Sequence, residues 1–296
     1  MLAQDLVDVT PQAYSRALKR ARDGETYRLL GRAVAGGAVG DRLLVAVHPL
    51  VGRDLRVLVT AALGDAAGAG GYATLHAAAS ETGPGTSDLR TVAVMAMVRR
   101  AGTAATADLV RAWAARDWGT RTTALMGLAA VGDDRVRDEV WSWLRRRLKG
   151  TRRQAMGMPT DVVCGLVYLL RHLRDDDGPT LTALLRGRWS ALDEEEREWL
   201  VEQWPGVAPG GPAEPAPPDG AVLGRWLADG STFSSMDWSG EWADRARDYA
   251  TSTVELDDEE GSVVEVTYSV ADGPEALALA EGLREASSRR HDVEPS

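Results

Sequence analysis

The sequence predicts a mainly α-helical solenoid, meaning a row of stacked helix pairs, followed by a small α+β C-terminal domain. The chain has 296 residues, of which 44% are hydrophobic, so it can bury a sizeable core. An arginine-centred apolar pattern returns about every 30 residues in the first half. After a proline-rich stretch, the apolar period changes from helical spacing to the alternation typical of a strand.

The repeated pattern is an arginine followed by apolar residues at helical spacing and by small residues. Its four copies begin at Arg28, Arg56, Arg90 and Arg121, with separations of 28, 34 and 31 residues. A helix pair of this length cannot bury its apolar stripe alone and must stack on its neighbours. Small residues such as Ala124 and Gly127 predict close contact between helices.

The stretch LVRAWAARDWGTRTTALMGLAAVGD, residues 109–133, resembles a HEAT repeat of the short form similar to that of phycobilisome-lyase-type proteins. In that pattern an Asp lies in the turn and an Arg begins the second helix, and the matching residues here are Asp117 and Arg121. The resemblance is good over 11–148 and weak up to 204. It implies a HEAT-like right-handed α-α superhelix in which the arginine column is structural and pairs with turn carboxylates. It indicates almost nothing about function.

Further helices are expected after residue 148 without the arginine signature. Thr160 is expected to cap a strongly apolar helix, and segments 178–189 and 193–204 form the next pair. The second of these begins with an acidic run, which suits a first helical turn and the polar outer face of a terminal repeat.

Prolines and glycines dominate 205–220, which predicts a semi-flexible linker. It divides the chain into a helical repeat domain, 1–204, and a small α+β domain, 221–296. In the second domain we expect helices at 221–227 and 238–250, a hairpin formed by 254–256 and 263–270 with an acidic tip, and a C-terminal helix from Pro274.

Composition favours a cytoplasmic protein that does not enter a membrane. The first residues are acidic, no apolar run approaches a membrane span, and Cys164 is the single cysteine. Lysine occurs only twice among 34 basic residues, while alanine and glycine are abundant. This bias indicates a high-GC bacterial genome, as in actinobacteria, so arginine enrichment is not by itself a binding signal.

The sequence contains no recognisable catalytic, cofactor or metal motif, so we expect a protein that is not an enzyme. Its four histidines are scattered, and Cys164 lies inside an apolar helix. The glycine-rich stretch 64–72 follows a predicted helix and lacks the Lys-Ser/Thr pair of a phosphate-binding loop.

Charge is distributed unevenly. Residues 205–296 contain 19 acidic and 6 basic residues, whereas 87–153 has a net charge of +7. The positive segment ends in a cluster formed by Arg145, Arg146, Arg147, Lys149, Arg152 and Arg153. Together with Trp118, which is expected in a turn between helices, these are the candidate partner-binding residues.

Two functions from different classes remain open. The first is a non-enzymatic scaffold that binds another protein or peptide on the concave face of the solenoid. The second is a nucleic-acid or phosphate binder that uses the basic 87–153 region, by analogy with HEAT-like DNA glycosylases. A weaker third possibility follows from the lyase-like resemblance, namely a factor that helps to attach a prosthetic group to a partner.

Overall fold

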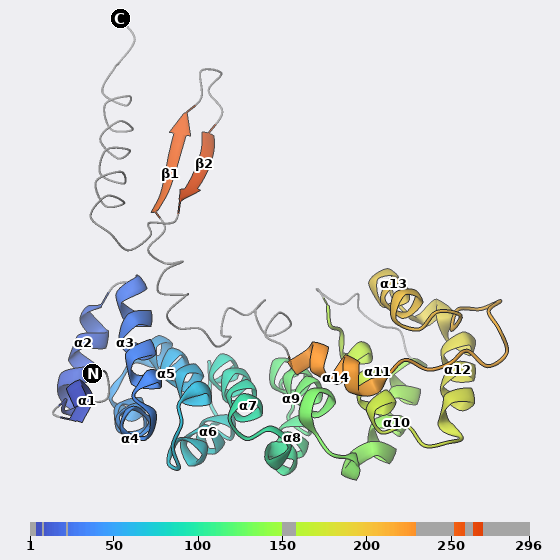
Figure 1. The fold of residues 1–296 in the computed structure, drawn as a ribbon, viewed down its shortest axis with the longest axis horizontal. Helices are drawn as coiled ribbons and strands as arrows, with labels where there is room; N and C mark the ends of the chain where they lie inside the picture. The colour runs from blue at the N-terminus through green and yellow to red at the C-terminus, as the bar shows by residue number, and fades with distance from the viewer. Residues whose placement is uncertain are drawn as a thin grey trace, which may run out of the picture.

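The computed structural model describes residues 4–7, 9–21, 23–149, 158–228, 252–257 and 263–268. The described part is mainly α-helical. Its helices pack side by side in a row, with α1 and α2 at one end and α12 and α13 at the other (Figure 1).

The helices and strands have the following bounds. The first helices are α1 (Gln4–Val7), α2 (Pro11–Arg20), α3 (Asp23–Ala35), α4 (Gly37–Val47), α5 (Arg53–Asp65), α6 (Gly71–Ala79) and α7 (Ser87–Ala101). They are followed by α8 (Thr106–Trp113), α9 (Trp118–Val131), α10 (Arg137–Arg147), α11 (Asp161–Arg171), α12 (Asp177–Gly187), α13 (Glu194–Gln203) and α14 (Gly220–Ala228). Four 3-10 segments are η1 (His48–Leu50), η2 (Gly102–Ala105), η3 (Asp134–Val136) and η4 (Trp189–Ala191), and the strands are β1 (Ser252–Asp257) and β2 (Val263–Tyr268).

The central helices form two layers (Figure 1). One layer contains α3, α5, α7, α9 and α11, which pack on one another in that order, and the other contains α4, α6, α8 and α10. All four copies of the arginine pattern fall in the first layer, in α3, α5, α7 and α9. The expected stacking of helix pairs is therefore observed.

Small residues bring these helices close together, as their positions in the pattern predict. A Cβ atom at Gly127 of α9 would lie 2.6 Å from Cγ2 of Val98 in α7. A Cβ atom at Gly64 of α5 would lie 2.8 Å from the Cα atom of Ala96. Residues 92–98 of α7 are apolar on every side, and the neighbouring helices bury all of them.

Side-chain caps fix the starts of several helices, among them α9, α11 and α13. The Asp117 carboxylate accepts from the backbone N–H of Thr120 at 2.9 Å, and Thr160 Oγ1 accepts from that of Val163 at 3.2 Å. Asp193 and Glu196 form a capping box at the start of α13. The acidic run is thus only partly a polar outer face, because Glu196 is fully buried and accepts a hydrogen bond from Thr160 Oγ1 at 2.5 Å.

The predicted linker is packed against the helical array. The Arg186 guanidinium donates to the carbonyl oxygens of Gly206, Val207 and Pro212, and the indole of the buried Trp204 donates to the Pro215 carbonyl. Beyond this segment, α14 packs on α9 and α11. The sequence had assigned α14 to the C-terminal domain, so the proline-rich segment does not separate it from the repeats.

Strands β1 and β2 pair antiparallel, with Val254 opposite Val266. They lie at the positions where the sequence predicts a hairpin. The expected helices at 238–250 and from Pro274, and most of the acidic tip, lie outside the described residues.

Candidate functional site

Helices α5, α7, α9 and α11 run in the same direction because one antiparallel helix separates each from the next in the chain. Their first turns therefore meet at one edge of the array, where α6, α8 and α10 end. Their last turns meet at the opposite edge. We call the edge at which α5, α7, α9 and α11 begin the basic edge.

The arginine column lies along the basic edge and joins successive repeats. Arg56 pairs with Glu81, in the loop before α7, and Arg90 pairs with Asp117, in the turn before α9, at 3.3 Å. Ser87 Oγ also donates to Asp117 at 2.7 Å. Each carboxylate comes from the following repeat, and the hydrogen bond from Arg56 lowers the pKa of Glu81.

Asp88 lies only two residues before Arg90 in the chain but does not pair with it. Instead, Asp88 lies 3.8 Å from Arg53, an exposed pair. Arg28 and Arg121 are exposed. The loop before α11, residues 148–160, contains no Asp or Glu, so it offers Arg121 no equivalent of Glu81 or Asp117.

Trp118 is the first residue of α9, directly after the N-cap Asp117. It is 60% exposed, whereas the other tryptophans in the described ranges are buried or half-buried. Exposed placement at the turn agrees with the sequence-based expectation, although the residue already belongs to the helix.

The basic cluster lies at the end of α10, on the same edge. The Arg145 guanidinium lies over the Trp141 ring, 5.0 Å from its centroid. Arg147 donates to Asp161 of α11 at 2.8 Å, so its charge is offset within the protein. Arg146 and Lys149 are exposed, and Arg152 and Arg153 lie outside the described residues.

The repeat that carries Trp118 packs against the repeat that carries the basic cluster through two tryptophans. Trp113, in the last turn of α8, packs edge-on against Trp143 of α10, with ring centroids 6.2 Å apart. The turn that leads to Trp118 therefore lies beside the end of α10. We call the exposed residues of this region the Trp118 surface, which comprises Trp118 and the five cations Arg116, Arg121, Arg145, Arg146 and Lys149.

At the opposite edge, two ion pairs near the ends of α5 and α7 are largely buried. Arg100 of α7 contacts Asp41 of α4 at 2.7 Å, and Arg99 contacts Asp65 of α5 at 2.7 Å. The Asp41 carboxylate also accepts from the backbone N–H of Gly70 at 3.0 Å. The sequence did not reveal this network. It explains the glycine-rich stretch, because a Cβ atom at Gly68 would lie 2.3 Å from Asp41 Oδ2.

A smaller polar cluster ties α6 to α8 in the other layer. The Tyr72 hydroxyl donates to Asp108 at 2.5 Å, and Arg111 pairs with the same carboxylate. His76 Nε2 lies 3.6 Å from Asp108 and 3.1 Å from an Arg111 nitrogen. Because Asp108 already accepts from Tyr72 and pairs with Arg111, we interpret this cluster as a structural contact between two repeats and not as a site for proton transfer.

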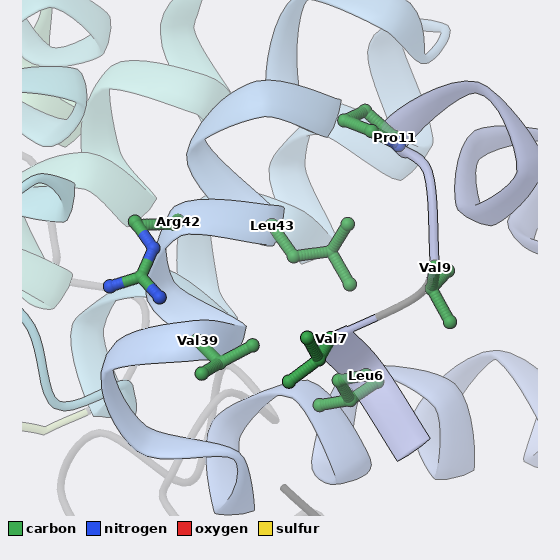
Figure 2. A pocket seen from close by; sticks show the side chains of 7 residues that line it. All are labelled: Leu6, Val7, Val9, Pro11, Val39, Arg42 and Leu43. Carbon is green, nitrogen blue, oxygen red and sulfur yellow. The ribbon is translucent and has the colours of Figure 1, made fainter. Parts of the chain in front are cut away.

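A pocket of about 230 Å³ opens at the N-terminal end of the array (Figure 2). Apolar side chains of α1, α4, Val9 and Pro11 line it, and among the described lining residues Arg42 alone is charged. Such a lining offers no polar constellation for chemistry. The described residues contain no group of three or more His, Cys, Asp or Glu side chains placed to hold a metal. Within the same residues, no helix is long and apolar enough to cross a membrane.

The chain matches no protein-family profile, no curated protein and no solved structure. Its candidate site is therefore defined by the geometry of the basic edge alone.

Proposed function

We propose that this chain is a non-enzymatic interaction scaffold built on HEAT-like repeats and that its partner is another protein. The Trp118 surface is the observation that carries the proposal. It combines a tryptophan that is 60% exposed with five exposed cations, none of which forms an ion pair with a residue in the described ranges. Trp and Arg are among the residues most enriched at the centres of protein interfaces.

We further infer that the row of helix pairs is a HEAT-like right-handed α-α superhelix and that the chain after α14 forms a small α+β domain. The two alternating layers and the pairing of Arg56 and Arg90 with the next repeat support this inference. The sequence placed the partner on the concave face. Since α14 already covers part of α9 and α11, the exposed basic edge is now the better candidate for that contact.

A nucleic-acid or phosphate binder remains the second candidate, because residues 87–153 have a net charge of +7. Two observations weigh against it. The whole chain has a net charge of −10, and the column arginines Arg56 and Arg90 are offset by Glu81 and Asp117.

Capture and DNA titration with the full-length chain separate the two candidates. We expect the tagged chain to retain a specific protein from an extract of its source cells and Trp118→Ala to retain less of it, as measured by quantitative mass spectrometry. Duplex DNA should bind only weakly between about 50 and 200 mM salt. A nucleic-acid function would instead give DNA affinity that falls steeply with salt, roughly a slope of −0.9 per phosphate contacted, with no retained protein.

A further inference from the structure

We propose that the Trp118 surface binds a short acidic segment of a partner protein that carries an aromatic or aliphatic side chain. The inference rests on the proposed scaffold function and adds the chemistry of the partner. In this arrangement Trp118 covers the apolar side chain, and the surrounding cations pair with carboxylates on either side of it.

The five cations of the surface are exposed and are available to pair with carboxylates of a partner. The two carboxylates at the starts of α9 and α11, on the same edge, already have partners. Asp117 accepts from Thr120 and Ser87 and pairs with Arg90, and Asp161 accepts from Arg147. Arg116, Arg121, Arg146 and Lys149 are exposed and form no ion pair with a described residue, and Arg145 lies over Trp141. Charge complementarity therefore selects an acidic partner.

Trp118 projects from a rigid base. Asp117, the residue before Trp118, is held by hydrogen bonds from Ser87 and Thr120. At the residue after Trp118, a Cβ atom on Gly119 would lie 3.2 Å from Thr91 Oγ1, so the start of α9 sits tightly on α7. A tryptophan held in this way loses little conformational freedom when it binds a partner, which makes it an effective anchor.

The neighbouring charges favour a short protein segment over a nucleic acid. Along the basic edge towards α5, the chain exposes carboxylates at Asp88, whose side chain is 76% exposed, and at Glu81. These carboxylates pair with Arg53 and Arg56, so this part of the edge has little net positive charge with which to bind a continuous phosphate backbone. A peptide of a few acidic residues engages the Trp118 surface without reaching them.

The test uses the full-length chain and a fluorescein-labelled synthetic peptide of about ten residues, in which acidic residues flank a central leucine–phenylalanine pair. The comparison peptide has glutamine and asparagine in place of the acidic residues. Fluorescence anisotropy measures the affinity of each. We expect the acidic peptide to bind at least about tenfold more tightly than its amide counterpart, which corresponds to about 1.4 kcal/mol.

Charge reversal at the surface has a closely matched control. Arg146→Glu with Lys149→Glu should weaken acidic-peptide binding by about tenfold or more. Arg16→Glu with Lys19→Glu makes the same charge change, at the same spacing, on exposed residues of α2, and should change affinity less than about twofold. Trp118→Ala should weaken binding by about tenfold, whereas Val201→Ala, at a residue that is 52% exposed on α13, should not.

Several results overturn the proposal. These are equal binding of the two peptides, equal weakening by both charge reversals, no binding by the full-length chain, and tighter binding of duplex DNA that displaces the peptide. Binding that appears only when residues 229–296 are removed would identify the chain's own acidic region as the occupant. If the charge-reversed variant and Trp118→Ala both retain a captured partner fully, the scaffold function stands but the Trp118 surface is not its binding site.

Discussion

The guanidinium of Arg100 lies 2.7 Å from the carboxylate of Asp41, and the two side chains are only 7% and 1% exposed. The residues are 59 positions apart in the chain and connect α7 with α4. Arg100 also donates to the Gly68 carbonyl at 2.5 Å, while Asp41 accepts from the N–H groups of Gly70 and Gly71. One buried ion pair thus connects α4, α5, α6 and α7 with the loop between α5 and α6.

Asp41→Asn should destabilise the protein by about 3 to 5 kcal/mol, because it leaves the buried Arg100 charge without its counter-ion. The amide oxygen of asparagine still accepts from the Gly70 N–H, so the loss of stability measures the effect of removing the negative charge alone. Urea unfolding measures the free energy. Arg53→Gln removes the exposed pair with Asp88 and should change stability by less than about 1 kcal/mol. Equal losses in the two variants would show that Arg100 is compensated in another way.

Close helix contact at Gly127 gives the second prediction. Its Cβ position is 2.6 Å from Val98 Cγ2 and 3.2 Å from Leu109 Cδ2. Val98 is β-branched and buried, so it cannot rotate away freely. Gly127→Ala should therefore destabilise by about 1 to 3 kcal/mol, and Gly127→Glu by more.

Gly187→Ala is the control for Gly127→Ala, because it makes the same change at a position with open space. Gly187 is the last residue of α12, and nothing lies within 4 Å of its Cβ position. Gly187→Ala should leave stability unchanged or raise it by up to about 1 kcal/mol. Thermal melts followed by circular dichroism compare the variants. An unchanged melting temperature for Gly127→Glu would contradict the close packing of α9 on α7.

The repeat period allowed the sequence to predict the row of helix pairs, because apolar spacing and capping are local properties. Thr160 was identified as an N-cap from its position before an apolar run, and the structure places it there. The partners of the arginine column were not predictable in the same way. Arg90 is two residues from Asp88 in the chain, yet it reaches Asp117 in the next repeat, since stacking brings the starts of α7 and α9 together.

The Asp41–Arg100 pair was not predictable for a similar reason. It joins different repeats, and neither residue belongs to the repeated pattern. The candidate site was predicted as separate residues, Trp118 and the basic cluster. The Trp113–Trp143 packing joins the repeats that carry them, and the Arg147–Asp161 pair removes one arginine from the available cations.

The packing of α14 gives a third prediction. If residues 205–220 were a semi-flexible linker, a chain ending at Trp204 would remain soluble and helical. In the structure, Leu223 and Leu227 of α14 are buried, and a Cβ atom at Gly220 would lie 2.3 Å from the backbone nitrogen of Arg171 in α11. Removal of α14 should therefore lower stability by about 3 to 6 kcal/mol, because two buried leucines are lost from the array.

Two truncated chains measure this effect. A chain ending at Ala228 should melt at a higher temperature than one ending at Trp204, and the shorter chain should bind a hydrophobic dye. In the full-length chain, Leu223→Ala should destabilise by about 2 to 5 kcal/mol. Val222→Ala, at a residue that is 50% exposed, should have little effect. Identical melting of the two truncated chains would restore the linker interpretation.

His48 gives the last prediction, on the dependence of stability on pH. Its Nε2 lies 3.0 Å from Thr60 Oγ1, and the Thr60 hydroxyl donates to the Arg56 carbonyl at 2.7 Å, so His48 is the donor in this contact. Burial, with the nearby Arg56 charge, lowers the pKa of His48 to about 4, although Glu81 acts in the opposite direction. The unfolded chain has the ordinary value of about 6.5.

Between pH 6.5 and 4 the unfolded chain therefore binds a proton at His48 that the folded chain does not. The stability from neutral His48 is complete above pH 6.5 and is lost as the pH falls towards 4, by about 1 to 3 kcal/mol. His48→Gln keeps a donor for Thr60 and cannot titrate, so its free energy of unfolding should fall less between pH 7 and pH 5. Some slope should persist in His48→Gln because burial also lowers the pKa of His172. Equal slopes for wild type and His48→Gln, measured by urea unfolding at each pH, would show that His48 is not the group responsible.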